Sequence, residues 1–345
     1  MDELRDSARQ VLDGLGLAAP EASSWPVLAE LGWLMVAVPE ELGGLGMGLA
    51  GTCALCTELG RALGTIPFIP AMLSIDAVCR SELADREARL ERMMSGQDYV
   101  AVPMGDGQLS ATTGADGHSR LTGRAVAVPS ADTATHLLAC TADGTYLGLV
   151  PLEGPQVERV ARPTWDRTRR LFDVVLSGAA VDEELTLATG EPAQRLAARL
   201  ATRRDFTLAA ESVGGADALL EMTVEYLGTR EQFGRPLALF QALKHRCADL
   251  KAQTEAARAL LLDNLDRLEA GAEESEDAGR LGGTARLLAC AAYAAVAEEA
   301  VQLHGGIAMS EEHGCHLYLK RAMLNEHLGR QADCYDRALA TPFFE

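Results

Sequence analysis

The stretch REQFGRPLALFQALKHRCADL, residues 230–250, decides how the second half of the chain is interpreted. A long apolar-periodic segment ends before it, near Gly228, and Gly234-Arg235-Pro236 within it has the composition of a turn. Periodic apolar residues resume at Phe240. The stretch therefore predicts a tight connection between two long helices, with charged and amide side chains gathered in the turn.

This turn has the chemistry to bind a pyrophosphate. Arg230 offers paired guanidinium donors, and Gln232 adds an amide. Gln241 lies at the predicted start of the next helix, whose N-terminus carries partial positive charge. The same residues also fit a capped turn in which Phe233 packs into the core, so composition alone leaves both interpretations open.

A second stretch, Gln302-Leu303-His304-Gly305-Gly306, has the same ambiguity. Two glycines can end a helix with positive φ, or they can let a ring or a phosphate lie against bare backbone. His304 by itself is typical of a packed histidine, since no second histidine or acid stands at metal-ligand spacing.

Outward from these stretches, the pattern of the chain changes twice. Residues 1–96 are predicted to be helical, and residues 97–188 hold short Val-, Leu- and Thr-rich runs separated by turns. Six of these runs are predicted strands: YVAVPM (99–104), SRLTGRAVAVP (119–129), THLLACTA (135–142), TYLGLVPL (145–152), VERVAR (157–162) and RLFDVVLSGAAV (170–181). Residues 189–345 are helical again, with long helices predicted over 192–229, 240–270 and 277–304 and two shorter ones between 311 and 340. The fold is therefore expected to be mainly α, with a small central antiparallel β barrel or sandwich and a C-terminal four-helix bundle.

Composition excludes several classes of function. The 345 residues include 50 acids against 31 Lys and Arg, a net charge of -19, which argues against nucleic acid as a partner. The longest apolar run, residues 287–303, contains Glu298 and Glu299 and predicts a buried helix rather than a membrane span. Since the N-terminus is also polar, a cytoplasmic protein is expected, and its eight cysteines, Cys53 and Cys56 included, are expected to be reduced thiols.

Together the two stretches resemble the flavin-binding pattern of the acyl-CoA dehydrogenase family. That pattern reads Arg-x-x-Phe-Gly-x-Pro-x-x-x-Phe-Gln, followed later by Gln-x-x-Gly-Gly. VPEELGGLG (38–46), ELGRALGTIPF (58–68) and TRRLFDVVLSGAAV (168–181) also look like segments of that family. The resemblance implies N-terminal helices, a β domain and a C-terminal bundle. It also implies FAD at a subunit interface, an acyl-CoA substrate and an electron-transfer flavoprotein as electron acceptor.

In that family each FAD contacts two subunits, and one of them supplies the residues for the ADP end. The residues that match this set are present here: Arg230, Gln232, Phe233, Gln241, Gln302, Gly305 and Gly306.

The residues with which a subunit surrounds its own flavin ring look absent. Where the family has Thr-Glu-Pro and Gly-Ser, this chain reads VAVPMGDG over residues 100–107. Where the family has Trp-Ile-Thr, it reads Ala127-Val128-Pro129, and Pro129 has neither an N–H nor a hydroxyl.

The catalytic base also looks absent. In the family a Glu removes the α-proton while hydride leaves the β-carbon for the flavin. By spacing from Gln302 the Glu position falls on Gly329, and the alternative position used by a minority of members falls on Arg204. Neither residue can accept that proton. Asp205 and Glu326 lie close enough in sequence to be weaker candidates.

The economical hypothesis is a non-catalytic subunit of an α2β2 enzyme. A paralogous acyl-CoA dehydrogenase chain would carry the flavin pocket and the Glu, and the substrate would be a bulky acyl-CoA of the steroid side-chain type. Two alternatives are left open. One is a self-sufficient homo-oligomeric dehydrogenase with Asp205 or Glu326 as base, and the other is a scaffold of the same fold that binds no flavin.

Overall fold

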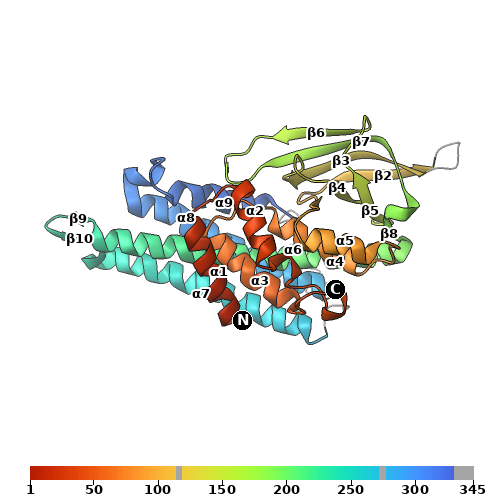
Figure 1. Cartoon of the computed structure of the whole chain (residues 1–345). Helices are drawn as coiled ribbons and strands as arrows, with labels where there is room; N and C mark the ends of the chain where they lie inside the picture. The colour runs from red at the N-terminus through yellow and green to blue at the C-terminus, as the bar shows by residue number, and fades with distance from the viewer. Residues whose placement is uncertain (114–118, 272–276, 330–345) are drawn as a thin grey trace, which may run out of the picture.

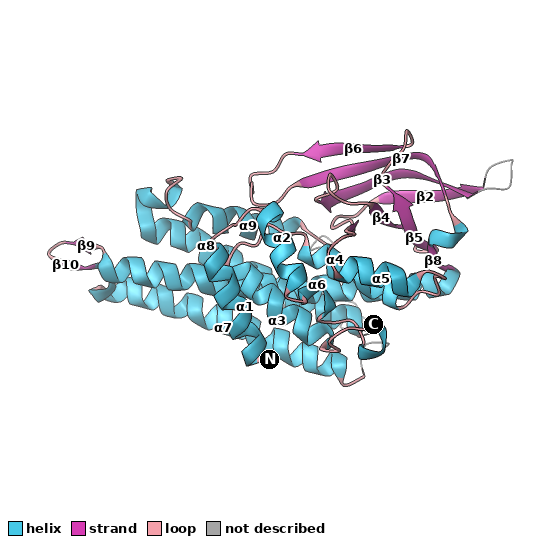
Figure 2. Cartoon of the chain, in the orientation of Figure 1, coloured by secondary structure: helices cyan, strands magenta, loops and turns pink. Residues whose placement is uncertain are grey.

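A computed structural model describes residues 1–113, 119–271 and 277–329 of the chain. Helices form an elongated body, and a β domain lies against one side of it (Figure 1, Figure 2). The order of elements is helices, strands, helices, as the sequence predicts. The fold expectation is confirmed.

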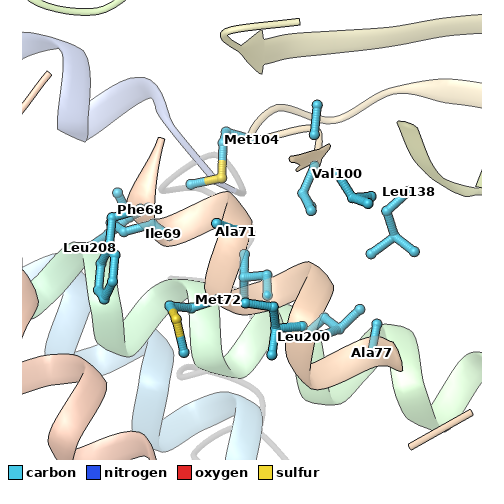
Figure 3. Close-up of a cluster of buried hydrophobic side chains, with 14 of the residues drawn as sticks. Phe68, Ile69, Ala71, Met72, Ala77, Val100, Met104, Leu138, Leu200 and Leu208 are labelled. Atoms are coloured by element: carbon cyan, nitrogen blue, oxygen red, sulfur yellow. The ribbon is translucent and has the colours of Figure 1, made fainter. Parts of the chain in front are cut away.

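The N-terminal helices are α1 (Asp2–Leu15), α2 (Glu21–Glu30), α3 (Gly48–Arg61), α4 (Phe68–Cys79) and α5 (Arg86–Met94), with 3₁₀ turns η1 (Trp33–Met35) and η2 (Glu40–Leu42) between α2 and α3. Almost every residue of α3 and α4 is buried, because these two helices lie between the rest of the N-terminal region and the bundle. Figure 3 shows Phe68, Ile69 and Met72 of α4 packed beside Leu200 and Leu208.

The β domain consists of two four-stranded sheets, in the orders β1-β4-β5-β8 and β2-β3-β7-β6. All pairings are antiparallel except that of β1 with β4. The strands are β1 (Val100–Ala101), β2 (Gln108–Thr113), β3 (Ser119–Pro129), β4 (His136–Cys140), β5 (Tyr146–Pro151), β6 (Val157–Arg162), β7 (Leu171–Ala180) and β8 (Thr186–Thr189), with the 3₁₀ turn η3 (Glu183–Leu185) before β8.

The sequence predicts six of these strands and misses β2 and β8. β2, QLSATT, is largely polar and exposed, so it lacks the apolar alternation that marks a strand. The first predicted strand is shorter than expected. After Ala101 the chain turns onto β3, where the Met104 and Gly105 N–H groups donate to the carbonyls of Ala127 and Val126.

The bundle contains α6 (Gly190–Thr229), α7 (Gln241–Glu269), α8 (Ala278–His304) and α9 (Cys315–His327). The three long helices begin and end within a few residues of the predicted positions. Between α6 and α7 lie a hairpin, β9 (Glu231–Gln232) and β10 (Arg235–Pro236), and the 3₁₀ turn η4 (Leu237–Leu239); η6 (Gly305–Met309) follows α8. The second short helix predicted before residue 340 would fall after α9, outside the described residues.

Helices α3 and α6 pack backbone against backbone. A Cβ added to Gly60 would lie 2.0 Å from the Glu211 carbonyl oxygen, and one added to Gly214 would lie 1.8 Å from the Thr57 carbonyl oxygen. Both positions therefore require glycine. This contact leaves no channel where the two helices cross.

A buried ion network joins the β domain to the bundle. The Arg321 guanidinium on α9 lies 2.7 Å from an Asp166 carboxylate oxygen and 2.7 Å from a Glu211 carboxylate oxygen. Arg169 binds Glu211 as well, and Thr168 donates to Asp166. Since Asp166, Thr168 and Arg169 precede β7 and Glu211 lies on α6, the network fixes the β domain, α6 and α9 relative to one another.

Candidate cofactor-binding site

Three helix ends meet at one end of the bundle. The Tyr226 ring, one turn before α6 ends, stacks on the His304 ring at the end of α8, with centroids 4.6 Å apart. Near the start of α7, Arg246 forms an ion pair with Glu299 of α8. These two contacts bring the Arg230 and Gln302 stretches to the same end of the molecule, beyond which the β9–β10 hairpin projects (Figure 1).

The hairpin turns at Phe233 and Gly234, with φ of 54° and 77°. Positive φ at both central residues is typical of a type I′ hairpin turn. A non-glycine residue in this region costs about 1–2 kcal/mol. The Phe233 side chain is 87% exposed, and its ring lies edge-on to Phe240 at a centroid distance of 6.1 Å. The core-packed alternative for Phe233 is therefore wrong, and the strained residue displays its ring to the outside.

Every residue predicted to bind the ADP end of FAD is exposed. We call this set the bundle-end surface: Arg230, Gln232, Phe233, Gln241, Gln302, Gly305 and Gly306. Gly305 ends α8 with φ of 65°, and a Cβ added to Gly305 or Gly306 would meet nothing within 4 Å. Packing within the chain therefore gives no reason for Gly306 to be glycine. A surface of this kind can form one wall of a binding site, and a second body is needed to enclose the ligand.

The charge of this region opposes that of the whole chain. Residues 230–251 hold five Arg and Lys against the two acids Glu231 and Asp249, although the chain carries a net charge of -19. One of the cations, Arg235, lies with its guanidinium carbon 4.1 Å from the centroid of the Phe240 ring. This cation–π contact holds a positive charge next to Gln241. Sequence alone does not distinguish Arg235 from the other cations, because the contact depends on how the hairpin folds back.

The two predicted positions of the catalytic base coincide in space. A Cβ on Gly329 would lie 3.2 Å from Arg204 Nε and 3.3 Å from Arg286 Nε. Gly329 has φ of 86°, and its N–H donates to the Met104 carbonyl at 2.5 Å. Where either counting scheme puts a carboxylate, the structure has a glycine between two guanidinium groups.

The weaker candidates for the base lie in different environments. Asp205 is 3% exposed, and its carboxylate lies 3.3 Å from Arg204, beside the Gly329 position. Glu326 is exposed near the end of α9, and partial burial raises the pKa of its carboxyl group. An arginine-bound carboxylate has its lone pairs engaged, which makes it a poor acceptor for a substrate proton.

The strand positions expected to contact the flavin ring face inward. Ala127, Val128 and Pro129 are all buried. The Ala127 N–H donates to the Asp173 carboxylate at 3.2 Å, and the Tyr99 hydroxyl donates to the Pro129 carbonyl at 2.8 Å. These polar groups are used within the β domain and are not offered to a ligand.

No other chemistry emerges from the described part of the chain. Cys53 and Cys56 are buried, and burial raises the pKa of the Cys53 thiol to about 12. A thiol with that pKa is not a nucleophile or metal ligand at neutral pH. Within the described residues no group of three or more His, Cys, Asp or Glu could hold a metal ion. None of the described helices is long and apolar enough to cross a membrane.

Similarity to known proteins covers nearly the whole chain. Residues 2–96 match the acyl-CoA dehydrogenase N-terminal domain, and residues 195–329 match the acyl-CoA dehydrogenase C-terminal domain. Acyl-CoA dehydrogenase IpdE2 of Mycobacterium tuberculosis is 34% identical over 303 residues, which is 88% of this chain and 80% of the relative.

Two solved structures of two-protein complexes are also similar. The ChsE4-ChsE5 complex from Mycobacterium tuberculosis matches with a TM-score of 0.88 and 26% identity, over 100% of this chain and 97% of the other. The Tcur3481-Tcur3483 steroid ACAD G363A variant matches with a TM-score of 0.86 and 27% identity, over 99% and 96%. The chain belongs to the acyl-CoA dehydrogenase family of FAD-dependent oxidoreductases.

Proposed function

We propose that this chain is the non-catalytic subunit of a heteromeric acyl-CoA dehydrogenase. It holds the ADP half of an FAD whose flavin ring and catalytic Glu belong to a paralogous partner chain. The proposal rests on a contrast between the residues for the ADP end of FAD and the positions expected for the catalytic base. All residues of the bundle-end surface are exposed together, whereas both base positions converge on Gly329 and Arg204.

The ADP half of FAD fits the bundle-end surface. A pyrophosphate needs directed cationic donors, and Arg230 and Arg235 lie on the hairpin, with Gln232 between them in the chain. Helix α7 begins at Gln241, so its N-terminal N–H groups add partial positive charge at the same end. The open space above Gly305 and Gly306 admits a planar ring against the backbone.

The flavin half does not fit this chain. Flavin, when bound, accepts the hydride in α,β-dehydrogenation, and a carboxylate must remove the α-proton. Here Ala127 and Pro129 turn their polar backbone atoms inward, and Arg204 and Arg286 flank the base position. The partner must therefore supply both the flavin pocket and the base.

Two-chain relatives support the assembly. The ChsE4-ChsE5 and Tcur3481-Tcur3483 structures each contain two differently named proteins, and the latter is described as a steroid acyl-CoA dehydrogenase. By analogy we propose an α2β2 assembly in the cytoplasm. It oxidises a bulky acyl-CoA, such as a steroid side-chain thioester, and passes electrons to an electron-transfer flavoprotein.

One observation favours a second candidate, a self-sufficient homo-oligomer. Asp205 is a buried carboxylate that forms an ion pair with Arg204, and Arg204 itself adjoins the Gly329 position. In that case the chain alone would bind FAD and be reduced by substrate. A scaffold that binds no flavin would retain neither FAD nor any dependence on Arg230.

Native mass spectrometry of the protein purified from its host, with a flavin count, tests the proposal. Two copies of this chain, two copies of a similar-sized different chain and two FAD are expected. A homotetramer with one FAD per chain would overturn it in favour of the Asp205 candidate. An assembly without flavin would favour the scaffold.

A further inference from the structure

Three aromatic side chains lie directly beneath the Gly305–Gly306 end of α8. The His304 ring stacks on Tyr226 at 4.6 Å, with an interplanar angle of 24°. The His313 ring lies 4.8 Å from His304 and 6.4 Å from Tyr226. Tyr226 belongs to α6, one turn before Arg230, and His313 belongs to the segment between η6 and α9. We call these three side chains the histidine stack; it connects the ends of α6 and α8, which lead into the Arg230 and Gly305–Gly306 parts of the bundle-end surface, with the segment before α9.

His304 has one hydrogen bond, and it defines the neutral form of the ring. Nδ1 lies 2.8 Å from the Ala300 carbonyl oxygen, an acceptor only, so Nδ1 carries the hydrogen. Nε2 is then a bare acceptor. His304 is 4% exposed, and Nε2 is buried without a hydrogen-bond partner among the residues that the structure describes. A ligand on the outer surface cannot reach this atom, so His304 acts through the position of its neighbours.

Protonation of His304 at Nε2 is unfavourable in this stack. Protonation puts an N–H and a full charge on Nε2, where no acceptor is available to either. The titratable groups that face the ring are Tyr226 from α6 and His313 from the following segment. His304's own helix contributes only the Ala300 carbonyl. The pKa of His304 is lowered mainly by burial, and the neighbouring His313 lowers it further. The hydrogen bond to Ala300 acts in the opposite direction but is outweighed.

We propose that neutral His304 is a positioning residue of the bundle-end surface, and that its protonation at acid pH separates the ends of α6 and α8 and releases FAD. The inference rests on the proposed function. It adds a regulatory property to that site, namely cofactor retention that depends on pH through this chain rather than through the catalytic partner.

The direction of the pH effect follows from the lowered pKa. The neutral ring is favoured in the folded stack, so the full stabilisation is present above the ordinary histidine value of about 6.5. It is lost as pH falls below that value and through the lower folded pKa. FAD release should therefore accelerate between about pH 6.5 and pH 5.

The test measures FAD release from the native complex by the gain of free-flavin fluorescence after dilution into buffers from about pH 8 to pH 5. His304→Asn retains a side-chain N–H that can donate to Ala300 and does not titrate. His316→Asn is the control, because His316 lies on α9 beside Lys320 and outside the stack. Faster release at the acid end than at the alkaline end is expected for wild type and for His316→Asn. His304→Asn should show a flat profile.

Each outcome has a distinct meaning. If wild type and His304→Asn lose FAD with the same pH profile, the histidine has no role and the inference is wrong, while the proposed function stands. If the complex retains no FAD at the alkaline end, the proposed function fails and this inference with it. An NMR titration of the His304 ring gives a second readout, and titration at or above its ordinary pKa would overturn the inference.

Discussion

Arg321→Met should disrupt the buried ion network that connects the β domain to the bundle. The Arg321 side chain is 1% exposed and donates to Asp166, Glu211 and Thr168 and, at 3.2 Å, to the Gly64 carbonyl. Among the residues that the structure describes, its loss leaves the Asp166 carboxylate with Thr168 and the Glu211 carboxylate with Arg169. Breaking a buried ion pair from one side costs about 3–5 kcal/mol, a large part of the free energy of unfolding of a typical domain.

Urea unfolding followed by circular dichroism measures this loss. Arg267→Met is the matched control, because Arg267 is 56% exposed and lies 4.0 Å from Asp263; it should change the free energy of unfolding by less than about 0.5 kcal/mol. Adding Asp166→Asn and Glu211→Gln to Arg321→Met should recover part of the loss, since the buried charges are then gone. If Arg321→Met alone lowers the free energy of unfolding by less than about 1 kcal/mol, the network does not hold the β domain and the bundle together.

The same network predicts how stability depends on pH. Burial alone would raise the pKa of Glu211, but Arg169 and Arg321 outweigh burial and hold this pKa below its usual range. The pKa of Asp166 is also lowered, because Arg321 and Thr168 outweigh the effect of burial there. Both carboxylates therefore stabilise the fold above their unfolded pKa values of about 4, and this stabilisation is lost as pH falls through the folded values. Arg321→Met removes one of the charges that hold both folded pKa values down, so it should lose less stability on acidification than the wild type does. Identical acid-unfolding curves for the two proteins would contradict this.

Three further predictions concern the candidate site and the helix crossing. Arg230→Ala should weaken FAD retention by the complex by roughly 10- to 150-fold, because it removes a charge-assisted bond worth about 1.5–3 kcal/mol. Arg267→Ala, the control, should leave FAD retention unchanged. Equal retention in the two variants would refute the ADP-side role of Arg230. Asp205→Asn should leave turnover within about threefold of wild type, a difference below about 1 kcal/mol, whereas a loss of several orders of magnitude would make Asp205 the base. Gly60→Ala should destabilise the chain by about 1–3 kcal/mol or prevent folding, because the added Cβ meets the Glu211 carbonyl. An unchanged midpoint of thermal unfolding would show instead that α3 and α6 can move apart to admit the methyl group.

The fold was predictable where periodicity is long. The three long bundle helices keep their apolar patterns, even through the glycine pairs Gly214-Gly215 and Gly282-Gly283, and the structure ends them at the predicted turns. β2 was not predicted because most of its residues are polar and Leu109 is its one large apolar residue, so it shows no apolar alternation. Composition does not place Phe233, because a phenylalanine beside Gly234 can face the core or the solvent. The exposure of its side chain in the folded hairpin decides it.

The site was predictable as two separate stretches but not as one surface. The Tyr226–His304 stack joins residues that no spacing rule pairs. The convergence of Arg204 with Gly329 was also beyond the sequence, because one lies on α6 and the other after α9. That convergence is informative, since two independent counts along the chain lead to one place in space.

The exposure of the whole bundle-end surface has a consequence for how such a complex would behave on dilution. The occupancy of a cofactor enclosed within one chain depends on its own dissociation constant alone, but the occupancy of a cofactor held between two chains also depends on whether the chains stay associated. In the proposed assembly, flavin occupancy becomes a measure of subunit association. Dilution below the dissociation constant of the subunits should then yield apoprotein from a sample that began fully loaded.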